Sequence, residues 1–465
     1  MTLNVVSTKR LVNCRYYIRL SFLAGEGSMA PGHKPTMGFW RTWGLSIGMM
    51  VGSGVFMLPT VLAPYGKFAL MSWLITGGGT IAMALSLAFM AKRIPKSGGP
   101  YAYTKAGFGD FAGFLMAWGY WISIWVSVAA VTVAFVGYLG AFFPSLKSSP
   151  NLALVAGLAL IWSLVLLNCR SVKGSSYLQL ITSLAKFLPL LFLALFGLVN
   201  VEAANYQSMP EPEDGLSALS ASSALAMWAF IGFEVATIPA GEIKDPAKTI
   251  PRATIASVLA VTVLYIGVTV AAFGLLPAEV LIASTAPLAD AAAALTGTLG
   301  ATVVAIVALI ATGSGVNANL FVVGQMPMAA ALDGLFPKIF GRLNTDDIPV
   351  AGFLIGGTLA SIALALNFVN GLIAAFEFLI LLATITALMP VAFSTAAAWL
   401  YSLKEPNYPR GARIRSALVA FVGFSYALWA IAGSGRDSVF WGFLLLMLGV
   451  PVYVWIVATK DEGAP

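Results

Sequence analysis

Charged residues are scarce in this chain. They make up 10% of its 465 residues, whereas hydrophobic residues make up 59%. A soluble domain carries about 25% charged residues, and a single soluble core stops growing at about 250–300 residues. We therefore expect most of the apolar surface to face lipid, so the lipid bilayer is the first predicted partner.

Cysteine and histidine are nearly absent. The only cysteines are Cys14 and Cys169, and His33 is the sole histidine. A disulfide framework, a histidine-based metal site and a Ser-His-Asp triad are therefore excluded. The chain also lacks a GxxxxGK[ST] phosphate-binding loop, which argues against nucleotide hydrolysis. The sequence thus predicts no enzyme active site, no cofactor and no metal.

Apolar stretches long enough to cross a bilayer recur along the chain. Each crossing helix needs about 20 largely apolar residues. Three stretches, the third, eighth and tenth, exceed one span, so we expect those helices to be tilted or to run past the bilayer. The twelve predicted spans cover residues 38–63, 68–91, 109–143, 151–169, 176–200, 217–240, 253–276, 297–331, 350–368, 371–400, 414–433 and 438–458.

Lysine and arginine fall almost entirely on one side of this arrangement. If the N-terminus is cytoplasmic, all 26 basic residues lie in inner segments except Lys67, Lys147 and Arg436 outside and Lys186 within a span. This alternation follows the positive-inside rule. The net charge of +7 is therefore a topology signal rather than a sign of a nucleic-acid partner. We predict a multi-pass protein of a bacterial inner membrane with both termini cytoplasmic.

The domain organisation is simple. The apolar run within residues 1–36 is short and interrupted by Arg19. We interpret these residues as a disordered tail, with Met29 and Met37 as alternative starts. Residues 37–465 form one predicted domain without an inserted soluble module. It divides into a first repeat over about 38–200, a second over about 217–400, and two final helices over about 414–458.

The first span contains a predicted helix break. Gly52, Ser53 and Gly54 weaken the helix, and Pro59 removes a further backbone donor. Unwound backbone at membrane depth is tolerated only where it lines a cavity. The freed N–H groups could hold a carboxylate, helped by a half-helix N-terminus. The alternative is close helix packing through small residues.

The sixth span contains a second break. Ile231, Gly232 and Glu234 follow Trp228 at mid-depth, and Pro239 comes after them. Carbonyls freed near Ile231 could accept hydrogen bonds from an ammonium group. Breaks five spans apart match an inverted five-helix repeat, and paired breaks indicate a transporter's central site. The predicted fold is therefore an all-α membrane protein of about twelve helices with helices one and six broken.

Four motifs together carry a resemblance to a known family. They are GSGVFMLP in the first span, SGGPYAY at 97–103, WAFIGFE in the sixth span and DGLFPKIF at 333–340. With these motifs in this order, residues 38–460 resemble the amino acid–polyamine–organocation transporter superfamily. Within it the chain is most similar to basic amino acid/polyamine antiporters of the arginine/agmatine type.

The resemblance implies a LeuT-like five-plus-five inverted repeat, alternating access and a homodimer. It also implies that Gly52, Ser53 and Gly54 hold a substrate carboxylate, and that Ile231 and Glu234 belong to the sixth-span part of the site. It further implies three gating aromatic residues, with Trp228 closing over the substrate from outside, Tyr120 forming a further gate and Tyr101 lying on the cytoplasmic side.

Several positions depart from the arginine exchanger. Met49–Val51 lacks its asparagine, Ala229 replaces a serine, and Val391 replaces a gating tyrosine. Asn319 stands where a tryptophan stacks on the cationic tail, and we keep Asn319 as a substrate-binding candidate. The backbone-binding elements are retained, whereas much of the side-chain pocket differs.

Two ionisable residues lie at mid-membrane depth. Lys186 is about ten residues into the fifth span, too deep to snorkel, which favours a functional role. In proton-coupled permeases of the superfamily, a lysine at this place approaches the broken first helix. We therefore predict that Lys186 and Glu234 couple transport to protons. The alternatives are a fixed structural cation for Lys186 and a helix–helix hydrogen bond for Glu234.

The function predicted from these features is secondary active transport of an amino acid. The leading interpretation is exchange of arginine for its decarboxylation product, agmatine, or a related polyamine. The alternative is a proton-coupled permease or exchanger of neutral amino acids, which Lys186 and Asn319 favour.

Overall fold

The computed structural model describes residues 37–52, 54–94, 99–170, 186–237, 243–346, 348–368, 371–404 and 409–461. Within these ranges the chain is helical, and the only β-type pairing is an isolated bridge between Met37 and Ile243. The all-α prediction is thus confirmed. The predicted tail, residues 1–36, lies outside the described residues.

Two spans are broken near their centres, at the predicted places. In the first, α2 (Phe39–Met50) ends ahead of Gly52, and the chain continues as η1 (Gly54–Phe56) and α3 (Leu58–Leu62). In the sixth, α12 (Gly215–Phe230) ends ahead of Gly232, and η3 (Phe233–Thr237) follows. Because α2 and α12 both end inside the molecule, their last carbonyl groups face its centre.

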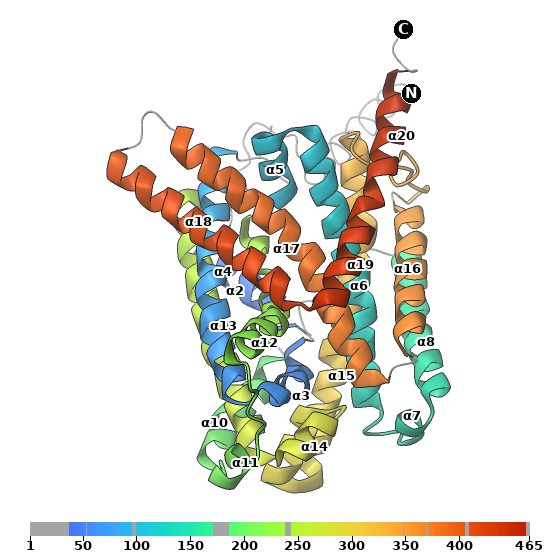
Figure 1. The fold of residues 1–465 in the computed structure, drawn as a ribbon. Coiled ribbons are helices and arrows are strands. Elements are labelled where there is room, and N and C mark those ends of the chain that lie inside the picture. Colours follow the sequence, from blue (N-terminus) through green and yellow to red (C-terminus); the bar gives the residue numbers. More distant parts are fainter. Residues whose placement is uncertain are drawn as a thin grey trace, which may run out of the picture.

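The other spans surround these breaks as long helices (Figure 1). In the described residues, eight helical segments are long and apolar enough to cross a membrane. The remaining predicted spans correspond to the broken pair, α10 and α16. The bounds are α4 (Lys67–Arg93), α6 (Asp110–Leu139), α8 (Pro150–Arg170), α10 (Phe187–Val199), α13 (Pro246–Leu275), α15 (Pro287–Leu332), α16 (Val350–Phe368), α17 (Leu372–Lys404), α18 (Arg410–Gly433), α19 (Arg436–Met447) and α20 (Gly449–Asp461).

Helix α6 forms the centre of the bundle. It is apolar all round and almost wholly buried, as expected for a helix enclosed by others. It packs against α15 and α17, and the hydroxyl of its Tyr138 donates to the carbonyl of Phe56 at 2.7 Å. This bond fixes the segment after the first break against a rigid element.

Short helices close the two ends of the bundle. At one end lies α5 (Pro100–Phe108), and the other carries α7 (Ser145–Ser148), α11 (Ala203–Gln207) and α14 (Ala278–Ala283) (Figure 1). Long helix α15 is kinked near this second end, where Gly297 adopts φ +67°. The predicted eighth span, 297–331, therefore corresponds to α15 beyond the kink.

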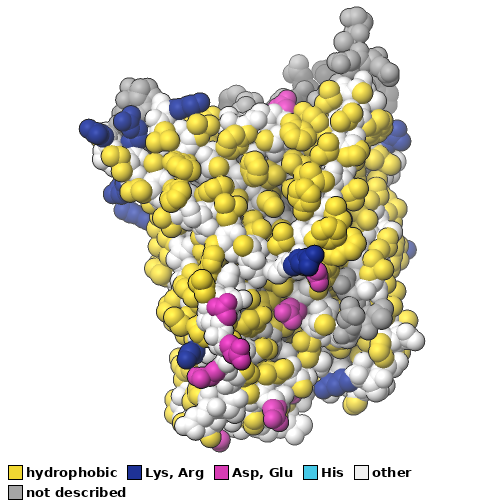
Figure 2. Space-filling model, viewed as in Figure 1, with side chains coloured by type: hydrophobic (Ala, Val, Ile, Leu, Met, Phe, Trp, Pro, Cys, Tyr) yellow, Lys and Arg dark blue, Asp and Glu magenta, His cyan; other side chains and the backbone are white. Residues whose placement is uncertain are grey.

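The two ends differ in charge (Figure 2). We call the end nearest α5 the basic end, since Arg93, Lys105, Lys404 and the start of α18 lie there. Acidic residues gather at the opposite, acidic end, where Lys67 pairs with Glu211 at 3.4 Å. The side walls between the ends are covered by apolar side chains, as a lipid-facing surface requires.

Candidate functional site

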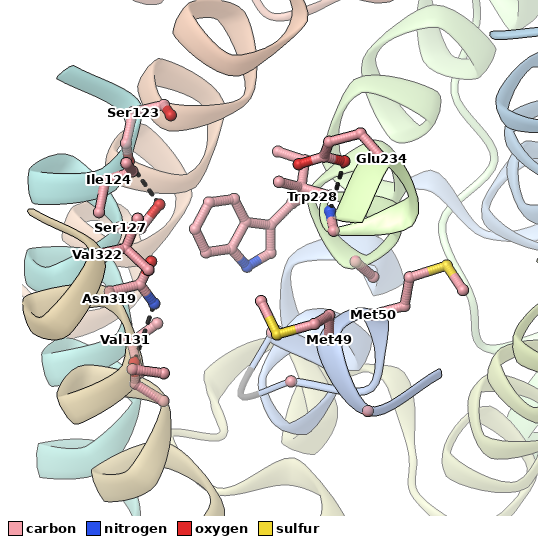
Figure 3. A pocket seen from close by; sticks show the side chains of 18 of the residues that line it. Met49, Met50, Ser123, Ile124, Ser127, Val131, Trp228, Glu234, Asn319 and Val322 are labelled. Atoms are coloured by element: carbon pink, nitrogen blue, oxygen red, sulfur yellow. Dashed lines mark hydrogen bonds between the residues drawn. The ribbon is translucent and has the colours of Figure 1, made fainter. Parts of the chain in front are cut away.

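A cavity of about 130 Å³ lies between the two helix breaks. It is bounded on one side by the ends of α2 and α12 and on the other by α6 and α15. Figure 3 shows Trp228 reaching from α12 across the cavity toward Ser127 and Asn319 on the opposite wall. The predicted site residues that line it are Gly52, Gly54, Tyr120, Lys186, Trp228, Ile231, Glu234 and Asn319. Ser53 lies outside the described residues.

The first break forms a tight turn against Trp228. The N–H of Gly52 donates to the carbonyl of Met50 at 2.7 Å, so this donor is already engaged. A Cβ atom on Gly54 would lie 2.5 Å from Nε1 of Trp228. Glycine is therefore required at position 54 by the close approach of the indole ring.

Glu234 is held at the cavity by two groups from different parts of the chain. Its side chain is 3% exposed. Its Oε2 accepts from the N–H of Gly232 at 2.9 Å, and its Oε1 accepts from the hydroxyl of Tyr120 at 3.4 Å. Gly232 adopts φ +109°, a conformation that favours glycine. The bond to Tyr120 joins the sixth span to α6, and the carboxylate also faces the cavity.

Lys186 enters the same cavity from the start of α10. It is 2% exposed, and it lines the cavity together with Glu234. Within the described residues, no carboxylate lies within ion-pair distance of Lys186. Lys186 and Glu234 therefore line the same cavity, and no ion pair joins them among the described residues.

Tyr265 on α13 is a positioning residue that the sequence reasoning missed, and it does not itself line the cavity. Its buried hydroxyl lies 2.8 Å from the carbonyl of Met50 and 3.2 Å from that of Ala229, and is placed to donate to either. Its ring packs against Phe230 and Trp73. One side chain thus bridges the C-terminal ends of α2 and α12. A lone tyrosine in an apolar run gives no sequence signal for this role.

The opposite wall contains two further missed residues, Ser123 and Ser127. They lie on the same face of α6 as Tyr120, three and seven residues after it. Helical spacing from Tyr120 could have identified them. Asn319 completes this wall from α15, with its Nδ2 donating to the carbonyl of Gly315 at 2.9 Å.

Tyr101, the third predicted gating residue, lies at the basic end and does not line the cavity. Its hydroxyl donates to Oδ2 of Asp333 at 2.9 Å, joining α5 to the segment that follows α15. Burial, with a smaller contribution from the Asp333 carboxylate, raises the pKa of the Tyr101 hydroxyl above its ordinary value. Val391 is buried on α17 and does not line the cavity within the described residues.

Comparisons with known proteins find similar transporters over most of the chain. The chain is 29% identical over 455 residues to a putative arginine/ornithine antiporter of Bacillus subtilis, covering 90% of this chain and 96% of that protein. It is 29% identical over 428 residues to the putrescine transporter PotE of Escherichia coli, covering 91% and 97%. It is 32% identical over 325 residues to the cadaverine/lysine antiporter of Escherichia coli, covering 69% and 72%.

The family assignment rests on nearly the whole chain. Residues 37–459 match the amino acid permease family, from the start of the first broken span to the end of the last helix. The family and the relatives are transporters rather than enzymes, and together with the membrane-spanning helices they support a multi-pass inner-membrane transporter. This chain belongs to the amino acid permease family.

Proposed function

We propose that the chain exchanges a basic amino acid for its decarboxylation product, with arginine and agmatine as the leading pair. The observation that carries this proposal is the buried carboxylate of Glu234, which faces a cavity between two helix breaks. The similarity to antiporters named for arginine/ornithine, putrescine and cadaverine/lysine supports the same substrate class.

The cavity suits an ammonium group. The C-terminal ends of α2 and α12 both point into it, and a helix C-terminus favours a cation. The carbonyl of Met50 already accepts from the N–H of Gly52 and lies within reach of the Tyr265 hydroxyl. In the proposal, the substrate ammonium group is therefore bound by Glu234 and by the backbone near Ile231, which lines the cavity.

The substrate carboxylate belongs at the first break. Gly54 begins η1, and its backbone approaches the ring of Trp228 closely. A carboxylate bound to the N–H groups of Gly52–Gly54 requires the turn between Gly52 and Met50 to open. Trp228 lies across the cavity, where it would pack on the substrate and occlude it.

The wall formed by Ser123, Ser127 and Asn319 would receive the substrate tail. It offers oxygen acceptors without a full charge, which suits the several N–H donors of a guanidinium or amine. The alternative substrate is a neutral amino acid taken up with a proton. Asn319 favours this second function, as does Lys186, which lines the cavity without an ion-pair partner among the residues that the structure describes.

Counterflow into liposomes separates the two functions. Vesicles containing the purified protein are loaded with agmatine, putrescine or cadaverine and offered labelled arginine, ornithine or lysine. Uptake of a basic amino acid that depends on internal polyamine supports exchange. Uptake of alanine or leucine driven by an inward proton gradient, with no uptake of basic amino acids, would replace the proposal with the permease.

We also propose that the basic end is cytoplasmic in a bacterial inner membrane, with both termini on that side, and that the protein works as a homodimer. The charge difference between the ends supports the orientation. Exposed aromatic residues on the outer helices α19 and α20, namely Phe440, Trp441 and Trp455, offer a surface for a second copy. The accessibility of tags at the two termini tests the orientation, and the mass of the protein in detergent tests the homodimer.

The domain division is proposed as two inverted repeats followed by two outer helices. Its support is the position of the breaks at Met50–Gly54 and Phe230–Phe233 in corresponding spans of the two repeats. Crosslinks that hold α2 to α12 should permit transport, whereas crosslinks from α2 to α6 should block it. The reverse result would contradict a mobile unit that contains both breaks.

A further inference from the structure

A groove on the outer surface at the basic end is separate from the transport cavity. It lies between the last turns of α17 and the first turns of α18, and it encloses about 640 Å³. Two arginines, Arg410 and Arg413, line its upper part. In Figure 2, Lys and Arg side chains gather at the upper left, over the ends of α17 and α18 as placed in Figure 1.

The rest of the groove is apolar and open toward the membrane. Leu403, Ile414 and Leu418 are 56%, 49% and 58% exposed. The floor is formed by Trp399 and Phe421, whose rings meet edge to face at 5.2 Å. Since this surface belongs to a membrane-spanning helix pair, lipid is the molecule that contacts it, and acyl chains match its apolar floor.

The vertical order of these residues matches the order of groups in a phospholipid. Along the axis of α18, which runs obliquely in Figure 1, Arg413 and Phe421 lie about 12 Å apart, at about 1.5 Å per residue. Because α18 begins at the basic end and runs into the bundle wall, Phe421 lies deeper than the two arginines. Trp399 has the amphipathic character of residues enriched at the interface. Charge at one end and acyl-sized apolar surface below it are thus found in one groove.

The two guanidinium groups select the headgroup. Among the described residues, neither Arg410 nor Arg413 forms an ion pair with a carboxylate. Guanidinium groups bind phosphate oxygens bidentately, and basic pockets between transmembrane helices bind anionic headgroups. We propose that the groove between α17 and α18 binds one anionic phospholipid, with its phosphate on Arg410 and Arg413 and an acyl chain along Leu418 and Phe421.

The position of the groove connects this lipid to the closure at the basic end. On α17, the hydroxyl of Ser394 donates to the carbonyl of Pro100 at 2.7 Å, and that of Tyr401 donates to the carbonyl of Ala106 at 3.3 Å. Both acceptors belong to α5, which carries Tyr101. A lipid packed against Trp399 and Leu403 therefore supports the helix that holds α5 in place.

The test measures thermal unfolding of the purified full-length protein in detergent with added phosphatidylglycerol or phosphatidylcholine of the same acyl chains. We expect phosphatidylglycerol to raise the unfolding temperature, and the lipid concentration at half of this rise gives its apparent affinity. The double variant Arg410→Gln/Arg413→Gln should weaken this apparent affinity at least tenfold. Arg415→Gln is the matched control, because Arg415 is an exposed arginine of the same helix that does not line the groove. Its affinity for phosphatidylglycerol should be unchanged.

Several results would overturn the proposal. They are equal stabilisation by phosphatidylcholine, an equal loss in Arg415→Gln, or the same stabilisation by inorganic phosphate alone. A dimer that forms without added lipid and is lost in the double variant would assign the groove to a second copy instead. If the double variant does not fold, Arg410→Gln alone replaces it, with an expected weakening of at least threefold.

Discussion

At the scale of single residues, the contact between Gly54 and Trp228 sets the geometry of the first break. Gly54→Ala places a methyl group 2.5 Å from the indole nitrogen, so the ring must move out of its place across the cavity. Overpacking of this kind costs about 1–3 kcal/mol. We expect transport in liposomes to fall at least tenfold while the protein still folds.

Gly52→Ala is the matched control for this prediction. Its added Cβ would meet only backbone oxygens at 3.7 and 3.8 Å, an ordinary contact distance. Since Gly52 would hold the substrate through its N–H rather than a side chain, we expect a smaller loss of transport than in Gly54→Ala. Equal losses in the two variants would mean that backbone freedom, rather than room for Trp228, requires glycine at the break.

Tyr265 gives a second prediction at this scale. Tyr265→Phe removes the hydroxyl that bridges the carbonyls of Met50 and Ala229, which should lower the unfolding free energy by about 1 kcal/mol. Because these carbonyls end the two half-helices at the cavity, the KM for substrate should rise several-fold as well. Unfolding curves and initial transport rates measure the two effects.

Tyr206→Phe separates stability from function in this experiment. Its hydroxyl also donates to a carbonyl, that of Val270 on α13, at 2.6 Å, but it lies at the acidic end away from the cavity. We expect a similar loss of stability with no change in KM. A KM increase in both variants would show that general loosening of α13 is responsible.

Lys186 gives a third prediction. Lys186 is the one basic side chain among the described residues that line the cavity. We expect Lys186→Ala to abolish the pH dependence of transport. The measurement is the initial rate of counterflow between pH 5 and 8 in variant and wild-type vesicles. Retention of the wild-type pH profile would reject proton coupling through Lys186 and leave it a structural cation.

At the scale of elements, the two broken helices were predictable and the group that joins them was not. Glycines beside a serine, and a glycine ahead of a glutamate, weaken a helix locally. Each break can therefore be predicted from a few neighbouring residues. The bridge by Tyr265 depends on two carbonyls 215 and 36 residues away in sequence. Only the packing of α13 against α2 brings them together.

Helix α5 gives the prediction that belongs to this scale. Tyr101→Phe removes the hydrogen bond to Asp333, so α5 should separate more easily from the end of α15. With Cys14 and Cys169 replaced by serine, a cysteine introduced at Ala318 reports access to the cavity. We expect its labelling by an impermeant reagent from the basic end to increase several-fold.

The pH dependence of this effect follows from the pKa of Tyr101. Burial and Asp333 raise that pKa above its ordinary value of about 10, so the hydroxyl keeps its proton throughout the range from pH 6 to 9. The difference between Tyr101→Phe and wild type should therefore be the same at both ends of this range. A difference that disappears by pH 9 would contradict the assignment of Tyr101 as the donor.

At the scale of the whole molecule, charge placement predicted the order of the spans well. Successive long helices run in opposite directions, and basic residues such as Arg93, Lys105 and Arg413 lie in the connections at one end of the bundle. The kink at Gly297 was not foreseen, since apolar residues continue through it and α15 begins at Pro287. The cavity wall at Ser123 was predictable from its helical spacing to Tyr120, whereas the packing of this face of α6 against α15 was not.

The placement of Lys186 and Glu234 on the walls of one cavity has an electrical consequence. Among the described residues that line it, these are the only lysine, arginine, aspartate or glutamate side chains, and their formal charges sum to zero when both are ionised. An empty cavity would then reorient without moving charge through the membrane field. A cavity carrying a monovalent amino acid one way and a divalent polyamine the other would transfer one net charge per cycle. Moving that charge through 100 mV corresponds to about 2.3 kcal/mol. The membrane voltage would thus act on the loaded steps alone.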